Sequence, residues 1–280
     1  MRLGIGFANV GPLGTAEGAE ALAAACDATG VESVWTVEHT VVPAGYASAY
    51  PYSRDGRMPG PESSPIPDPL VWLTWVAAHS DRVRLATGIL ILPQRNPVVL
   101  AKEVATLDAM SGGRVMLGIG VGWLAEEFAA LGVPFSARGQ RTDEYVAALR
   151  ELWTAPEPSF HGDFVDFERA LSEPKPTQRP VPIHVGGHSV AAARRAGRLG
   201  DGFFPVRAKD LDALLPEMRA AAEAAGRDSD AIEVTTGAWP TAESVSDLAA
   251  KGVSRLVIPP PAFTPDDLGP ALERVVDAIA

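Results

Sequence analysis

The chain has 280 residues, 46% of them hydrophobic, and its 35 acidic and 24 basic side chains give a formal net charge of −11. This length suits one large α/β domain over residues 1–280, and the acidic balance argues against a nucleic-acid surface, which needs a basic patch. No apolar run approaches the ~20 residues of a membrane span, and the N-terminus lacks the apolar stretch of a signal peptide, so we expect a cytoplasmic protein that does not bind a membrane.

Runs that favour strands alternate with amphipathic helical stretches along the whole chain. The strands are expected at residues 2–7, 33–38, 84–91, 115–120, 182–186, 202–206, 233–238 and 254–259. Between them, apolar residues recur with the i, i+3, i+4, i+7 period of helices that pack on a sheet, as at Ala19, Leu22, Ala23 and Cys26. Strands that are each followed by a helix predict a closed parallel (β/α)8 barrel, the TIM-barrel fold.

Helix starts are marked by a capping side chain before a proline, at Asp68-Pro69, Asn96-Pro97 and Thr264-Pro265. A doubly wound open sheet is the competing architecture, because residues 120–125 fit the pattern G-x-G-x-x-A. That motif lies at the fourth predicted strand instead of the first, and no suitable acidic residue ends a following strand about 20 residues later. The barrel is therefore the preferred prediction.

Two segments are longer than ordinary connections of such a barrel. Residues 40–67 follow the second strand and are rich in Pro, Gly, Ser and Tyr, which predicts a lid over the substrate. Tyr46, Tyr50 and Tyr52 lie in this lid, where they either contact substrate or pack the loop. Residues 154–181, before the fifth strand, contain a hairpin-like alternation at 160–167 and a Pro-rich stretch, and we interpret them as an insertion that caps the barrel.

Two motifs at strand ends carry the chemistry. His39 follows the second strand, and histidine titrates near neutrality, so it can give or take a proton; the alternative is a histidine that only caps a strand. Residues 186–189, Gly-Gly-His-Ser, precede a predicted helix whose free N–H groups and dipole favour an anion. His184 and His188 have i, i+4 spacing, but the intervening glycines preclude a helix, and we expect no metal site.

Three runs of sequence, at residues 30–39, 92–103 and 111–123, resemble the luciferase-like monooxygenase superfamily, in particular its oxidoreductases that use the deazaflavin coenzyme F420. Weaker agreement continues to residue 206. The resemblance implies a barrel with the cofactor at the C-terminal ends of its strands, and often a homodimer. Such a dimer would use the helices after the second and third strands, where Trp72, Trp75, Val76 and Leu100 offer apolar surface unless they pack against the barrel.

The resemblance also implies roles for individual residues. A histidine at the position of His39 sits over the reactive ring of the cofactor, and Glu38 would orient the imidazole or bond the cofactor. The F420 branch often has aspartate at position 38, so the longer glutamate puts a direct cofactor contact in doubt. Gly88-Ile89 corresponds to a bulge with a non-proline cis peptide behind the ring, unless Gly88 is an ordinary strand glycine.

The remaining contacts of such a cofactor are inferred from the residues themselves. Gly120 and Gly122 would leave a slot for the cofactor, with Trp123 and Glu126 reaching the mouth of the barrel, whereas the alternative is a packing role for the glycines. The cofactor phosphate would bind at Gly186, Gly187, His188 and Ser189. Tyr46 and Tyr50 are the candidate substrate contacts.

We therefore expect a coenzyme F420-dependent oxidoreductase that transfers a hydride between the deazaflavin and a small organic substrate. His39 is the candidate proton donor or acceptor, and the cofactor supplies the redox chemistry. Two alternatives remain open: an FMN-dependent flavin monooxygenase with the same barrel, because FMN also has a tricyclic ring and a phosphate, and a cofactor-binding protein without turnover.

Overall fold

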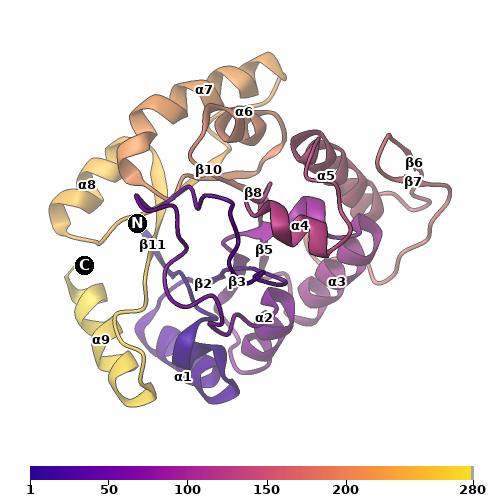
Figure 1. Ribbon diagram of the computed structural model, residues 1–280. Helices are drawn as coiled ribbons and strands as arrows, with labels where there is room; N and C mark the ends of the chain where they lie inside the picture. The colour runs from indigo at the N-terminus through magenta and orange to yellow at the C-terminus, as the bar shows by residue number, and fades with distance from the viewer. Residues whose placement is uncertain (279–280) are drawn as a thin grey trace.

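A ring of parallel strands surrounded by helices makes up the fold (Figure 1). The computed structural model describes residues 1–278, and in that part of the chain eight strands close the barrel: β1 (Arg2–Ile5), β2 (Ser33–Thr36), β3 (Arg84–Thr87), β5 (Val115–Gly120), β8 (Ile183–Gly186), β9 (Gly202–Phe204), β10 (Glu233–Gly237) and β11 (Val253–Ile258). β1 pairs with both β2 and β11, and β3 pairs with β5, so the sheet has no open edge. The predicted barrel is confirmed, and the doubly wound sheet is excluded.

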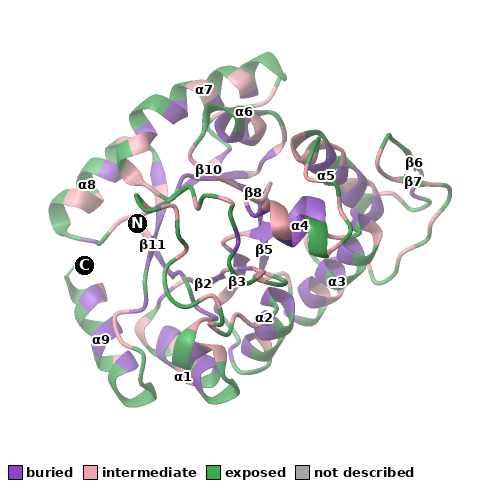
Figure 2. Ribbon diagram, viewed as in Figure 1, coloured by how far each residue is buried: buried purple, intermediate pink, exposed green. Residues whose placement is uncertain are grey.

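The helices surround this ring and turn their buried sides toward it, except that the short α4 (Ala125–Ala130) lies over the ring (Figure 1 and Figure 2). They are α1 (Ala16–Thr29), α2 (Pro69–Ala78), α3 (Pro97–Met110), α4 (Ala125–Ala130), α5 (Arg138–Thr154), α6 (Val190–Leu199), α7 (Leu211–Ala224), α8 (Ala242–Ala250) and α9 (Pro265–Asp277). Asp68 and Asn96 cap α2 and α3 as predicted. Thr264 precedes α9, but its hydroxyl donates to the Asp267 side chain and does not cap a backbone N–H.

The predicted third strand is interrupted. β3 ends at Thr87, the chain bulges at Gly88 and Ile89, and a short strand β4 (Leu90–Ile91) resumes beside β5. Three single turns of 3-10 helix complete the connections: η1 (Gly11–Gly14), η2 (Leu92–Gln94) and η3 (Ala208–Asp210).

Large side chains inside the barrel are matched with glycines on neighbouring strands. An apolar layer fills the middle of the barrel, made by Trp35, Ala86, Met116, Phe204 and Val257. A Cβ atom on Gly4 would lie 2.8 Å from the Trp35 indole nitrogen, and one on Gly202 would overlap the ring of His184. Strand glycines therefore make room here for indole and imidazole rings, because a closed barrel leaves little internal volume.

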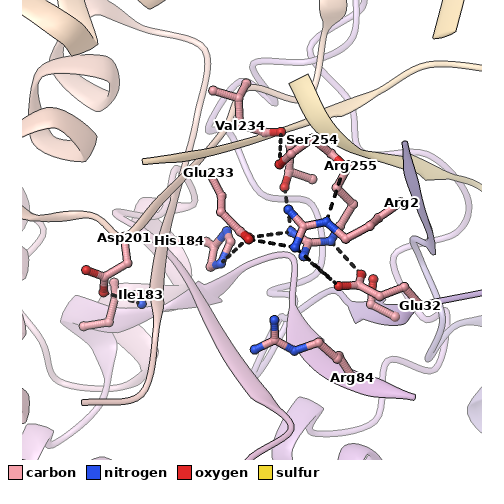
Figure 3. A network of polar contacts seen from close by, with 12 residues as sticks. Arg2, Glu32, Arg84, Ile183, His184, Asp201, Glu233, Val234, Ser254 and Arg255 are labelled. Atoms are coloured by element: carbon pink, nitrogen blue, oxygen red, sulfur yellow. Dashed lines mark hydrogen bonds and ion pairs between the residues drawn. The ribbon is translucent and has the colours of Figure 1, made fainter. Parts of the chain in front are cut away.

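Charged residues fill the N-terminal end of the barrel, which we call the floor: Arg2, Glu32, His184, Glu233 and Arg255 (Figure 3). Arg255 is 0% exposed, and its guanidinium donates to Glu32 at 2.7 and 2.8 Å and to Glu233 at 3.2 Å. Arg2 adds a second bond to Glu233 at 2.7 Å. The buried charges thus satisfy one another below the apolar layer, as burial of charge requires.

The insertion between α5 and β8 is placed differently from the prediction. Its hairpin, β6 (Phe160–His161) with β7 (Asp166–Phe167), is present, but it lies beside α3 and α5 (Figure 1). Three backbone N–H groups of the hairpin turn, at residues 163–165, donate to Glu144 on α5. The prediction that this hairpin caps the barrel is therefore wrong. Only the following stretch reaches the start of a barrel strand, where Gln178 bonds the carbonyl of Val115.

The surface of α2 also corrects an expectation. Trp72, Val76 and Leu100 are buried in the core between helices and barrel, so they offer no surface to a second copy. Val71 and Trp75 are the exposed apolar residues of α2. A homodimer through this helix stays a prediction. In the described part of the chain, no helix has both the length and the apolar character that crossing a membrane demands.

Candidate active site

Loops that are far apart in sequence meet at the C-terminal end of the barrel, which we call the mouth. A series of aromatic rings connects them: His39 to Trp123 with centroids 5.7 Å apart, Trp123 to Tyr50 at 5.2 Å, Tyr50 to Tyr52 at 5.2 Å, and Tyr52 to His188 at 4.6 Å. These residues follow β2, β5 and β8. The expectation that His39 and the Gly-Gly turn share one rim is therefore confirmed.

The segment between β2 and α2, residues 40–67, lies across the mouth (Figure 1) and forms the predicted lid. Glu126 on α4 holds its middle: its carboxylate accepts from the Ala47 and Ser48 amides at 2.7 and 3.0 Å and from the Ser48 hydroxyl at 2.7 Å. The Ser48 hydroxyl and the Ala47 amide lower the pKa of Glu126 to about 2. Glu126 thus binds the lid, in place of the cofactor contact expected of it.

His39 has a buried carboxylate as its partner. Its Nδ1 lies 2.9 Å from Oε2 of Glu127, whose side chain is fully buried, whereas the His39 side chain is 8% exposed. The other oxygen, Oε1, accepts from the amides of Thr40 and Val41 at 2.6 and 3.3 Å. Glu127 was missed in the sequence, although helical spacing places it on the same face of α4 as the buried Leu124 and Phe128.

Glu38 takes a different role from the one expected. Its carboxylate accepts from the Ile91 amide and from the Arg95 guanidinium, with an Nε distance of 2.9 Å. Arg95 also binds Asp68 at 2.7 Å. Burial raises the pKa of Glu38, and Arg95 and the Ile91 amide offset part of that rise. Glu38 therefore ties the end of β2 to the segment after the bulge, and the prediction that it orients the imidazole is wrong.

The bulge at Gly88 and Ile89 matches the resemblance. The Gly88–Ile89 peptide is cis, and a Cβ on Gly88 would press on Trp35 and Phe204 at 3.2 and 3.3 Å. A residue with a side chain would therefore fit tightly at position 88, because this position lies directly above the apolar layer. Ile89 is carried into the mouth from the same bulge.

The cofactor slot expected at the glycines of β5 is already filled. A Cβ on Gly120 or on Gly186 would meet the side chain of Ile89, and one on Gly122 would meet Ile91 and Phe128. Gly122 also has a φ of +77°, which favours glycine. The packing alternative is therefore the correct one for Gly120 and Gly122. Gly120 and Gly186 leave the space in which Ile89 lies between β5 and β8.

The turn after β8 keeps the character of an anion site. Ser189 caps α6 by accepting from the Ala192 amide at 3.2 Å, while the amides of His188 and Ser189 have no acceptor among residues 1–278. Gly187 has a φ of +128°, and a Cβ there would lie 2.9 Å from that of Ala192. His188 Nδ1 is buried without a hydrogen-bond partner in the same part of the chain, and burial lowers the pKa of His188. His184, four residues before His188 in the sequence, lies in the floor and not at this turn.

The two candidate substrate tyrosines differ. Tyr46 is 3% exposed, its hydroxyl accepts from the Met58 amide at 2.9 Å, and the Arg57 guanidinium lies 4.8 Å above its ring. Tyr46 therefore packs the lid and is not a substrate contact in this arrangement. Tyr50 lies between Trp123 and Tyr52 in the mouth, and burial raises its pKa to about 12.

The opposite side of the mouth, formed by the loops after β9, β10, β11 and β1, carries exposed large apolar side chains. These are Phe7 at 48%, Val206 at 38%, Trp239 at 54% and Phe263 at 46% exposure. Phe7 has a φ of +52°, in the left-handed region that a phenylalanine seldom occupies. The sequence alone did not single out these residues, because the strands before their loops become neighbours only when β1 pairs with β11. We call this set the apolar rim.

Comparison with known proteins places the chain. The family model described as luciferase-like monooxygenase matches residues 5–264. An uncharacterized protein of Mycobacterium tuberculosis is 32% identical over 262 residues, 93% of each chain. An F420-dependent glucose-6-phosphate dehydrogenase of Kineococcus radiotolerans is 35% identical over 215 residues, 74% of this chain and 58% of that one. The crystal structure of an F420-dependent secondary alcohol dehydrogenase has the same fold, with a TM-score of 0.77 at 19% identity over 99% and 98% of the two chains.

Proposed function

Because the chain belongs to the luciferase-like monooxygenase family, we propose that this oxidoreductase uses coenzyme F420 to transfer a hydride to or from a small organic substrate. The observation that carries the proposal is His39, held by a buried carboxylate in the same mouth as an anion-binding turn. The choice of F420 is supported by the relative of 35% identity that bears this cofactor in its name.

The residues of the mouth fit such a cofactor. The free amides of His188 and Ser189 at the start of α6 are donors suited to a phosphate, and the orphaned His188 Nδ1 can add a donor in the tautomer that carries the proton there. Ile89, seated between Gly120 and Gly186, would support a flat ring from below, and His39 would face the ring from the β2 side. Gly187 allows the phosphate to approach the backbone, since no side chain intervenes.

When bound, F420 supplies the two-electron chemistry by accepting or giving a hydride. The protein moves the accompanying proton. In the oxidative direction, Nε2 of His39 takes the proton of the substrate hydroxyl as the C–H bond breaks, and in the reductive direction it returns that proton to the carbonyl oxygen. Glu127 keeps the imidazole in place, and the lid excludes water from the reacting atoms.

The apolar rim favours an uncharged organic substrate over a sugar phosphate. Its loops contain two cations, Arg207 and Lys209. Arg207 is paired with Asp210 at 2.7 Å, and Lys209 makes no ion pair within residues 1–278. A phosphate group would be better matched by several converging cations, whereas exposed Phe7, Trp239 and Phe263 suit an apolar body. We expect turnover of apolar secondary alcohols or ketones with F420, and much weaker turnover of glucose 6-phosphate under the same conditions.

Thermal unfolding with each cofactor tests the proposal. F420 at about 100 times its Kd should stabilise the protein by about 2.7 kcal/mol, and FMN should leave the unfolding temperature unchanged. A response to FMN alone would favour the flavin monooxygenase alternative, and a response to neither would remove the cofactor proposal. Binding of F420 without hydride transfer to any alcohol, ketone, imine or activated alkene would favour the protein without turnover.

A matched pair of variants locates the phosphate. Gly187→Ala places a methyl group at the anion turn and should abolish the F420 response. Gly226→Ala is the control, because Gly226 also has a positive φ of +68° but lies after α7, with open space around its Cβ position. Equal responses of the two variants would contradict the assignment of the turn.

A further inference from the structure

We propose that Glu127 is a positioning residue that holds His39 in the tautomer with the proton on Nδ1, so that Nε2 is the nitrogen that exchanges a proton with substrate. This inference rests on the proposed function. It concerns a residue on the short helix α4, 88 positions away from His39 in the chain.

The two oxygens of Glu127 bind different groups. Oε2 faces His39 Nδ1 at 2.9 Å, and Oε1 faces the backbone N–H groups of Thr40 and Val41. The two amides are donors that cannot change role, so Oε1 must accept. An ionised carboxylate has acceptors only, so Oε2 in that form offers His39 Nδ1 an acceptor and no proton.

The tautomer follows from this donor pattern. A neutral imidazole has one donor and one acceptor nitrogen, and Nδ1 must be the donor because its partner only accepts. The lone pair then resides on Nε2, which has no hydrogen-bond partner among residues 1–278. Trp123 packs edge-on against the imidazole, with the two planes at 86°, and limits its rotation.

The same carboxylate couples the base to the lid. Thr40 and Val41 are the first residues of the lid, and they share Oε1 while His39 uses Oε2. The neighbouring Glu126 binds the lid further along, at Ala47 and Ser48, and makes no contact with His39 in the described part of the chain. Adjacent glutamates therefore separate the two roles: both anchor the lid, but only Glu127 orients the imidazole.

Glu127→Gln tests the inference because it keeps the size of the side chain but has only one acceptor atom. The amides of Thr40 and Val41 require the amide oxygen, so the NH₂ group must face Nδ1 of His39. The imidazole then has to accept at Nδ1, and its proton moves to Nε2. The variant should therefore invert the tautomer without removing the contact.

Nitrogen-15 NMR of the histidine side chains reads the tautomer directly, in protein without cofactor, with the His39 signals assigned by their loss in His39→Asn. We expect the Nδ1–H pattern in the wild-type protein and in Glu126→Gln, and the Nε2–H pattern in Glu127→Gln. Glu127→Asp restores an acceptor-only side chain and should restore the Nδ1–H pattern. An Nε2–H pattern in the wild-type protein, or an unchanged pattern in Glu127→Gln, would overturn the inference.

Steady-state kinetics with F420 give the second readout. Glu127→Gln should lower kcat by at least about 100-fold, the lower end of what proton transfer contributes, with a much smaller change in KM. Rescue by Glu127→Asp of part of kcat is expected. Loss through KM alone would show that Glu127 only anchors the lid. If the NMR patterns are as expected but no variant or wild type turns over with F420, the proposed function fails and the positioning of His39 stands.

Discussion

Two histidines at opposite ends of the barrel show how surroundings decide what an imidazole can do. His184 lies in the floor, 1% exposed, with Nε2 3.8 Å from Glu233 and Nδ1 without a partner in the described chain. His39 lies in the mouth, with Nδ1 held at 2.9 Å by a carboxylate and Nε2 left for a ligand. Burial and the nearby Arg255 lower the pKa of His184 to about 4.

The two ends also differ in how they use charge. In the floor, Arg255 and Arg2 satisfy Glu32 and Glu233, and the apolar layer above separates them from the mouth. In the mouth, Glu38 binds Arg95 and Glu127 binds His39 in the segment after β2, while polar atoms at the β8 turn have no partner among residues 1–278. A structural network needs every charged group to have a partner within the protein. A binding site needs hydrogen-bonding groups that have none, because the ligand supplies the partner.

The largest effect is expected from His39→Asn. Loss of the proton-transferring nitrogen should lower kcat about 100- to 10,000-fold, whereas F420 should still stabilise the variant. Stopped-flow or steady-state absorbance of the deazaflavin measures the rate. Full activity in this variant would show that His39 does not transfer the proton, and would contradict the different roles assigned to the histidines at the two ends of the barrel.

The corresponding change in the floor is Arg255→Met. It removes the buried partner of Glu32 and leaves Glu233 with Arg2 alone, which should cost about 3 kcal/mol in the free energy of unfolding because the two carboxylates are partly exposed; urea denaturation measures it. The control is Arg194→Met, which removes an exposed pair with Glu217 and should cost 1 kcal/mol or less. If the two variants are equally stable, the floor network is not a structural element.

Acid should weaken the floor through His184. The pKa of His184 in the folded protein, about 4, lies below its ordinary value of 6.5. Between these two pH values the imidazole is therefore protonated in the unfolded chain and neutral in the folded one. Stability contributed by this group is full above pH 6.5 and falls as the pH drops toward 4, by at most roughly 3 kcal/mol. The lowered pKa values of Glu32 and Glu233 extend the loss to lower pH.

Urea denaturation at a series of pH values measures this slope. His184→Gln, which does not titrate, should flatten the part between pH 6.5 and 4 and keep the part below it. An unchanged slope in the variant would show that His184 is protonated in the folded protein as easily as in the unfolded chain.

The smallest effect is expected at the lid. Glu126→Gln replaces a charged acceptor of the Ala47 and Ser48 amides by a neutral one, which should loosen the lid without unfolding the barrel. Hydrogen exchange should be faster at these two amides and unchanged at the barrel strands. Faster exchange throughout the barrel would contradict a local role for Glu126.

The order of strands and helices was predictable because it depends on local period and on capping. Asp68 and Asn96 cap as predicted, and the bulge at Gly88 was indicated by resemblance. The position of the 160–167 hairpin was not, because an alternating pattern gives a hairpin but not the surface on which it packs. Here Glu144 on α5 fixes it.

The sequence predicted the parts of the site at His39 and at the β8 turn. It did not predict which side chains pack between these two places. A sequence shows that Gly120 lacks a side chain, but not that Ile89 fills the space. It places Glu38 next to His39, yet Glu38 binds Arg95, and the partner of His39 is Glu127 from α4. The residues of the apolar rim follow strands that only the barrel closure makes neighbours, so they leave no local signal.

A crystal structure of the protein with F420 is the most direct test of a shared site at the mouth. The account predicts the deazaflavin ring against Ile89 with Nε2 of His39 facing it, and a phosphate on the amides of His188 and Ser189. A cofactor bound away from His39, or with its phosphate elsewhere than at the β8 turn, would contradict it.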